Sequence, residues 1–138
     1  MFTKTLITAL ATAAAALAVP FNATEASQLV ARDQGRGTIY QQFGVAGSCG
    51  NVHGDGDYIV ALPHSYMQHQ YKSHWCGATV KIINHGSGDG NVRGNGREIT
   101  AIVADSCDGC GPSDIDLSVG AWAGITDNSG WSWFNAEW

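Results

Sequence analysis

Residues 104–118, with the sequence ADSCDGCGPSDIDLS, hold four aspartates and two cysteines in one short run. Asp105 ends an apolar stretch and Asp116 lies between Ile115 and Leu117, so we expect both carboxyl groups to emerge from a buried frame. Partial desolvation beside another acid raises a carboxyl pKa, and an acid that stays protonated can act as a proton donor. For Asp108 and Asp114 the favoured interpretation is a turn-bonding or helix-capping role, although Asp114 is also a candidate for substrate contact.

The four cysteines are an even number, and the favoured interpretation is two disulfides in any of three pairings. They are Cys49, Cys76, Cys107 and Cys110. The spacing of Cys107 and Cys110 also fits zinc ligands, but Cys49 and Cys76 do not form the second close pair of a tetracysteine site. The five histidines indicate no metal site either, because His64, His69 and His74 recur every five residues and share neither a helix face nor a strand face. We expect no metal and no cofactor.

The first eighteen residues of the 138-residue chain read as a secretory signal peptide, with a positive start at Lys4, an Ala/Leu run and a small-x-small cleavage site. The apolar run is shorter than the roughly 20 residues of a transmembrane helix. Residues 19–34 contain no glycine and no clear apolar period, which indicates a propeptide or a loose arm. Residues 35–138 then form one small domain of a secreted, extracellular protein.

The formal net charge of −5 argues against two classes of partner. Proteins that bind nucleic acid or anionic membranes normally present a basic face, which this composition does not supply. We therefore expect neither partner, and we expect a monomer.

Short β-branched or aromatic segments predict strands over residues 37–43, 57–62, 78–84 and 97–104, with a further strand inside 130–138. Residues 86–96 are rich in glycine and asparagine and suit a hairpin tip. Helical pieces are expected only near 63–67 and over 118–124, where Ser118 could cap the first turn. This pattern predicts an all-β fold, a small closed barrel or sandwich with one or two short helices.

The stretches GTIY, GSCG, DYIVALP, CGATVKIIN and REITAIVADSCDGCGPSDIDLSVGAW together resemble the double-psi β-barrel of expansins, RlpA-like proteins and barwin. The resemblance is strongest to the single-domain fungal proteins called loosenins, and it covers the chain after residue 35. It implies a six-stranded barrel with a groove across one face, and disulfides that join Cys49 to Cys76 and Cys107 to Cys110.

The resemblance also assigns roles to residues of the groove. It implies that Asp105 and Asp116 contact the glycan there, and it matches Thr38-Ile39-Tyr40-Gln41-Gln42 to a strand whose last residue is the catalytic base of related endoglucanases. Gln42 stands in that base position, and an amide cannot take a proton from water, so ordinary hydrolysis is not expected.

Some features of the resembling families are missing. Plant expansins have His-Phe-Asp where this chain has Asp114-Ile115-Asp116, bacterial ones have a tyrosine at the position of Cys107, and the C-terminal carbohydrate-binding domain of full expansins is absent. Sugar rings stack on aromatic faces, and Tyr40, Tyr66, Tyr71 and Trp75 are the candidates for such contact, with Tyr40, Gln42 and Trp75 taken as substrate-binding positions. Trp122 and either Trp133 or Phe134 are expected to pack in the core.

Three functions remain open. The preferred one is a secreted, non-hydrolytic protein that binds and loosens cell-wall polysaccharide such as cellulose, chitin or peptidoglycan. The second is an enzyme of the lytic transglycosylase type, in which one protonated carboxyl suffices because the substrate's own hydroxyl replaces water. The third is a protease inhibitor or effector on the same scaffold, which the long 86–96 loop leaves open.

Overall fold

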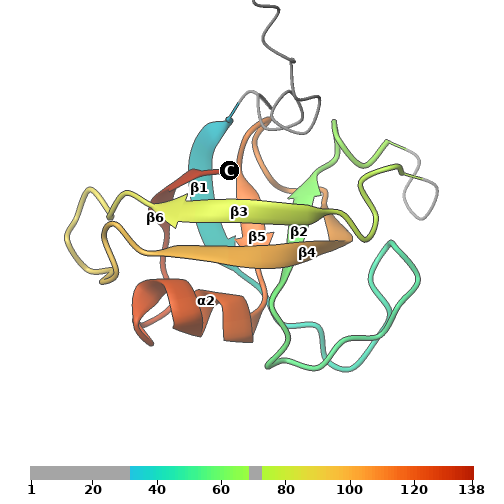
Figure 1. Ribbon diagram of the computed structural model, residues 1–138, viewed down its shortest axis with the longest axis horizontal. Helices are drawn as coiled ribbons and strands as arrows, with labels where there is room; N and C mark the ends of the chain where they lie inside the picture. The colour runs from blue at the N-terminus through green and yellow to red at the C-terminus, as the bar shows by residue number, and fades with distance from the viewer. Residues whose placement is uncertain (1–31, 69–72) are drawn as a thin grey trace, which may run out of the picture. The chain divides into compact units, whose positions relative to one another are not determined.

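Six strands and one helix make up the part of the chain that the computed structural model describes, residues 32–68 and 73–138 (Figure 1). The strands and the helix are β1 (Gln34–Ile39), β2 (Ile59–Pro63), β3 (Thr79–Asn84), β4 (Glu98–Cys107), β5 (Ile115–Leu117), α2 (Val119–Thr126) and β6 (Phe134–Glu137). The strands close in the order β1-β5-β2-β4-β3-β6, with β6 pairing back onto β1. The predicted all-β, six-stranded closed barrel with one short helix is confirmed.

The barrel core is apolar and is closed at one end by the helix. Ile82, Val103, Leu117 and similar residues from the strands fill it, and the buried rings of Trp122 and Phe134 meet there with centroids 5.8 Å apart. Helix α2 begins where expected, since the Ser118 hydroxyl accepts the backbone N–H of Ala121. The packing role predicted for Trp122 and Phe134 is confirmed.

Two strands near the site, β1 and β5, differ from the prediction. The strand expected over 37–43 ends at Ile39, because the chain turns away from the sheet after Tyr40. The three-residue strand β5, which carries Asp116, was not predicted from the residue pattern. It is shorter than the runs that periodicity detects and lies among turn residues.

Both disulfides form, with the pairing that the resemblance implies. Cys49 bonds to Cys76 across 27 positions of sequence, and Cys107 bonds to Cys110 across three. Because the first links the loop after β1 to the loop before β3, it constrains two segments that are distant in the chain.

Some expectations lie outside the described residues, namely the signal peptide over 1–18, most of the arm over 19–34, and the positions of His69 and Tyr71. The described structure begins at Arg32, and β1 begins at Gln34, inside the segment expected to be an arm. Within the described ranges, no helix has the length and hydropathy of a membrane span.

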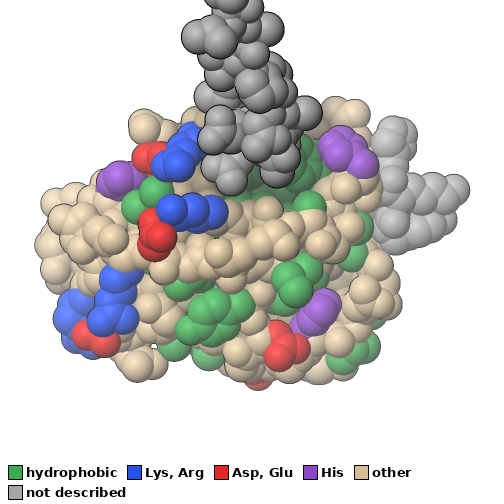
Figure 2. All heavy atoms as spheres, in the orientation of Figure 1, with side chains coloured by type: hydrophobic (Ala, Val, Ile, Leu, Met, Phe, Trp, Pro, Cys, Tyr) green, Lys and Arg blue, Asp and Glu red, His purple; other side chains and the backbone are tan. Residues whose placement is uncertain are grey.

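Charged side chains on the visible face lie in small mixed groups rather than in a basic patch (Figure 2). Lys81 pairs with Glu98 at 2.7 Å, and Arg97 pairs with Asp127 at 3.4 Å. Pairing of this kind leaves little unbalanced positive charge on this side of the barrel.

Candidate functional site

A bulge in β4 decides which way Asp105 points. β2 and β4 run parallel, and their register shifts between Val60 and Ala61, so that Val103 lies beside Val60 but Asp105 lies beside Ala61. Ala104 is the extra residue. A bulge re-aims the side chains that follow it, and here it places Asp105 outside the core that Val103 enters.

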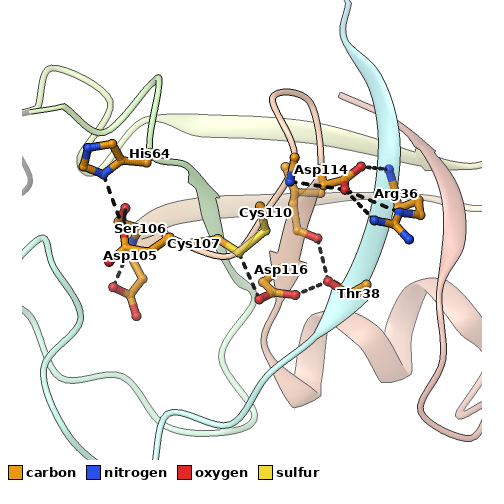
Figure 3. Close-up of a disulfide and its surroundings, with 12 residues drawn as sticks. Arg36, Thr38, His64, Asp105, Ser106, Cys107, Cys110, Asp114 and Asp116 are labelled. Carbon is orange, nitrogen blue, oxygen red and sulfur yellow. Dashed lines mark hydrogen bonds and ion pairs between the residues drawn. A yellow bond between two sulfur atoms is a disulfide. The ribbon is translucent and has the colours of Figure 1, made fainter.

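Asp116 reaches the same face from the other side of β2. Its strand neighbour in β2 is again Ala61, and its neighbour in β1 is Thr38. Since residues directly opposite one another in a sheet point to the same face, Asp116 and Asp105 flank Ala61 on one surface. Figure 3 shows both carboxyl groups extending to the same side. Two strand spacings separate their backbones, about 10 Å.

The two oxygens of Asp116 have different surroundings. Oδ1 accepts a hydrogen bond from the hydroxyl of Thr38. Oδ2 lies 3.3 Å from Sγ of Cys107, which is bonded to Cys110 and has no proton to donate. Oδ2 therefore has no donor among the described residues and can accept a hydrogen bond from a ligand.

Asp105 is held by backbone donors. Its Oδ1 accepts the N–H of Ser48 at 2.7 Å and the N–H of Ser106 at 2.8 Å. Gly47 packs directly on it, because a Cβ at that position would lie 3.0 Å from Cγ of Asp105 and 2.5 Å from the carbonyl oxygen of Ala104. The loop after β1 thus depends on a glycine to reach Asp105.

Tyr40 lies close enough to both acids for their charges to act on its phenol. Burial raises the pKa of Tyr40 above its ordinary value, and the neighbouring charges of Asp105 and Asp116 raise it further. The phenol therefore stays protonated at neutral pH and remains a potential donor. Its hydroxyl lies beside the carboxylate of Asp105, and this side-chain interaction also raises the pKa of Tyr40. Gln42 Oε1 and Ser48 Oγ, from the same segment, have no hydrogen-bond partner among the described residues.

A shallow groove of about 390 Å³ opens beside Asp116. It is lined by Arg36, Thr38, Ser106, Cys107, Asp108, Gly109, Cys110, Asp114 and Asp116. A second groove of about 430 Å³ over β1 and β6 shares Arg36 and Asp114 with it, so the two are adjacent. No Phe, Tyr or Trp side chain is among the described residues that line either groove, and Asp105 lies outside both.

Asp114 forms an ion pair with Arg36. Its carboxylate accepts the backbone N–H of Arg36 at 2.7 Å and pairs with the guanidinium at 3.1 Å (Figure 3). Burial alone would raise the pKa of Asp114, but the hydrogen bonds and charge of Arg36 outweigh it and lower the pKa. The turn-bonding role considered for Asp114 corresponds to a separate contact, in which the N–H of Gly111 donates to Oδ2 at 3.3 Å. With Arg36 and Gly111 both bound to it, this carboxylate is less free to bind substrate than that of Asp116.

The remaining predicted positions lie apart from the groove. Gln42, expected in the base position, is 7% exposed and lies three residues beyond the end of β1. Trp75 packs edge-on against Tyr66 at 5.6 Å, and Tyr66 packs in turn against Trp138 at 5.2 Å. These rings form a partly buried cluster and present no stacking face to the groove beside Asp116.

Cys107, Cys110 and Asp116 bring their ligand-type atoms within 4.8 Å of one another, but both sulfurs are tied in the disulfide. The thiolates that bind metals are therefore not available in this form. What the site offers is one carboxylate with an open oxygen, a protonated phenol nearby, and hydroxyl donors along the rim.

The sequence analysis named the two acids as candidates but did not identify the residues that orient them. Thr38 lies in the strand predicted over residues 37–43, but its contact with Asp116 was not predicted because the partner strand β5 was not predicted. Ser48 and Gly47 contact Asp105 through their backbone, and no pattern of side chains in the sequence predicts such a contact.

No protein-family model matches the chain, and no curated protein sequence matches it either. Solved structures do resemble it. The Streptomyces papain inhibitor superposes with a TM-score of 0.58 at 24% identity, over 78% of this chain and 93% of that one.

Clavibacter michiganensis expansin also resembles this chain. An Asp-to-Asn variant of that expansin in complex with cellohexaose superposes with a TM-score of 0.58 at 18% identity. The apo expansin does so with a TM-score of 0.56 at 21% identity. In both cases 78% of this chain matches 48% of the expansin, so the chain spans about half the expansin's length. The chain therefore has the double-psi β-barrel fold of expansin-like and barwin-like proteins.

Proposed function

We propose that this double-psi β-barrel is a secreted protein that binds cell-wall polysaccharide along the groove beside Asp116 and loosens it without hydrolysis. The observation that carries the proposal is the open Oδ2 of Asp116, on a carboxylate held in place by Thr38. A sugar hydroxyl is a donor that such an oxygen accepts, and a hydrogen bond to a charged group contributes about 1.5–3 kcal/mol. An expansin of the same fold, whose solved complex contains cellohexaose, supports the choice of ligand class.

The surroundings of the other acids favour binding over hydrolysis. A glycosidase places a second carboxyl about 5–9.5 Å from the first, as nucleophile or as base. Asp105 has one oxygen bound by two backbone N–H groups, and Asp114 is paired with Arg36. Gln42, in the position of the base, is an amide. The two disulfides fit an oxidising, extracellular compartment.

The test is a pull-down of the folded protein with cellulose, chitin and peptidoglycan, with reducing ends measured in the same tube. We expect retention on at least one polymer without release of reducing ends. Asp116→Asn should weaken retention about tenfold or more, while Asp55→Asn, which changes an exposed carboxylate without a hydrogen bond or ion pair among the described residues, should not. Release from peptidoglycan alone would instead support a lytic transglycosylase.

A second candidate is inhibition of a cysteine protease. It is favoured by the Streptomyces papain inhibitor, because this chain covers 93% of that protein and both share the single barrel. If this alternative holds, the protein inhibits papain with a fixed stoichiometry, is not retained on the polymers, and is unaffected by Asp116→Asn.

A further inference from the structure

The segment from Tyr40 to Ser48, here called the 40–48 loop, begins and ends at the acid pair. Tyr40 is still bonded to β5, through its N–H to the carbonyl of Leu117, and its ring lies in the field of both acids. At the other end the N–H of Ser48 donates to Asp105. The loop therefore projects from the site and returns to it.

The tip of this loop exposes apolar side chains in a strained conformation. Phe43 is 77% exposed with φ of 53°, followed by Gly44 with φ of 67° and by Val45, which is 63% exposed. A non-glycine residue in the left-handed region is uncommon and costs of order 1–3 kcal/mol. The turn that imposes this conformation is closed by the N–H of Val45 on the carbonyl of Gln42. The turn holds the phenyl ring of Phe43 in solvent, so the ring adds no buried apolar area that would stabilise the fold.

Chain length limits how far the ring can be from the acids. Phe43 is three residues from Tyr40, so their Cα atoms are at most about 11 Å apart. Neither the groove beside Asp116 nor the adjacent groove has a Phe, Tyr or Trp side chain among the described residues that line it, and Tyr66 and Trp75 pack against each other elsewhere. Phe43 is thus an exposed aromatic ring that the fold keeps near Asp105.

We propose that Phe43 is a stacking platform for a pyranose ring of the same glycan chain that contacts Asp116. The inference rests on the proposed function, which supplies the occupant. The C–H face of a β-linked pyranose is flat and apolar, and it matches an aromatic face. The glycan would then be held by hydrogen bonds at Asp116 and by ring stacking at the 40–48 loop.

The control is another exposed aromatic residue. Trp131 is 59% exposed in the connection between α2 and β6, which Figure 1 shows on the opposite side of the view from the loops that follow β1. Depletion isotherms on cellulose, chitin and peptidoglycan are measured for the wild type, Phe43→Ala, Phe43→Trp, Trp131→Ala and Asp116→Asn. Thermal unfolding of each variant shows whether the fold is kept.

On the polymer that retains the wild type, Phe43→Ala should raise the apparent Kd about fivefold to tenfold. Phe43→Trp should restore binding and Trp131→Ala should leave it unchanged. If Asp116→Asn weakens binding but Phe43→Ala behaves like Trp131→Ala, stacking is wrong and the proposed function stands. If no polymer retains the wild type, or if Asp116→Asn binds like the wild type, both proposals fail. Papain inhibition that is lost in Phe43→Ala, without polymer binding, would assign the loop to a protease.

Discussion

At Asp116, one carboxylate oxygen is committed to the fold and the other is not. Thr38 fixes Oδ1, while Oδ2 faces a disulfide sulfur that cannot donate. Asp114, two residues earlier, has both oxygens engaged by Arg36. Two aspartates in one Asp-Ile-Asp run therefore have different surroundings, and Asp116 has one oxygen that can accept a hydrogen bond from a ligand.

The ion pair of Asp114 predicts how stability depends on pH. Its pKa is lowered in the folded protein, so its stabilising contribution is present above about pH 4, the ordinary value, and is lost as the pH falls through the lower folded value. Asp114→Asn should reduce the free energy of unfolding by about 1–2 kcal/mol at pH 7 and make its decline at acid pH shallower. Urea denaturation from pH 7 to pH 2 measures both. Asp55→Asn is the control, and an equal slope in Asp114→Asn and the wild type would contradict the assignment.

Among the elements, the β4 bulge and the 40–48 loop act together to place Asp105. The bulge turns Asp105 outward, and the loop supplies the backbone N–H of Ser48 that holds it. The close approach of Gly47 makes this arrangement sensitive to a single methyl group.

Gly47→Ala should displace the loop, since the added Cβ would overlap the carbonyl oxygen of Ala104. We expect a loss of about 1–3 kcal/mol in the free energy of unfolding, together with weaker polysaccharide binding. Gly56→Ala is the matched control, because a Cβ there meets no atom within 4 Å and its φ is not in the left-handed region. Chemical denaturation measures the free energy of unfolding of both variants, and binding isotherms measure their affinity for the polysaccharide. A Gly47→Ala protein as stable as Gly56→Ala would show that the loop does not depend on this contact.

For the whole molecule, the two disulfides differ in what they contribute. Closing a 27-residue separation should stabilise by about 3–4 kcal/mol, and closing a separation of three by about 2 kcal/mol. The Cys107–Cys110 bridge, however, lines the groove and contacts Asp116.

Removing each bridge by paired alanine substitution should therefore separate stability from binding. The double variant Cys49→Ala/Cys76→Ala should lower the free energy of unfolding more than the double variant Cys107→Ala/Cys110→Ala does. The double variant Cys107→Ala/Cys110→Ala should weaken polysaccharide binding more than the other double variant does, although it lowers the free energy of unfolding less. Urea denaturation and binding isotherms of the two double variants provide the comparison, and the reverse order for stability would contradict the chain-entropy argument.

Much of the fold could be predicted from the sequence. β3 and β4 have clear apolar patterns, and α2 begins at a capping serine. β5 could not, since three residues are too few to show a period. Tyr40 and Phe43 extend the aromatic and β-branched run that predicts a strand, yet residues 40–43 leave the sheet. The chain turns there because Phe43 and Gly44 adopt the left-handed conformation and the N–H of Val45 bonds to the carbonyl of Gln42. The position of Asp116 between two buried residues could be predicted from its apolar neighbours, whereas the role inferred for Phe43 depends on a backbone conformation that composition does not reveal.

The most direct test of the central claim is an NMR titration of the isotopically labelled protein with β-1,4-linked hexasaccharides of glucose and of N-acetylglucosamine, with reducing ends measured before and after. The account predicts that amide shifts concentrate at Thr38, Ser106 and Asp116 for one of the two sugars, and that the hexasaccharide remains intact. Shifts confined to other parts of the barrel, no shifts with either sugar, or cleavage of the hexasaccharide would contradict it.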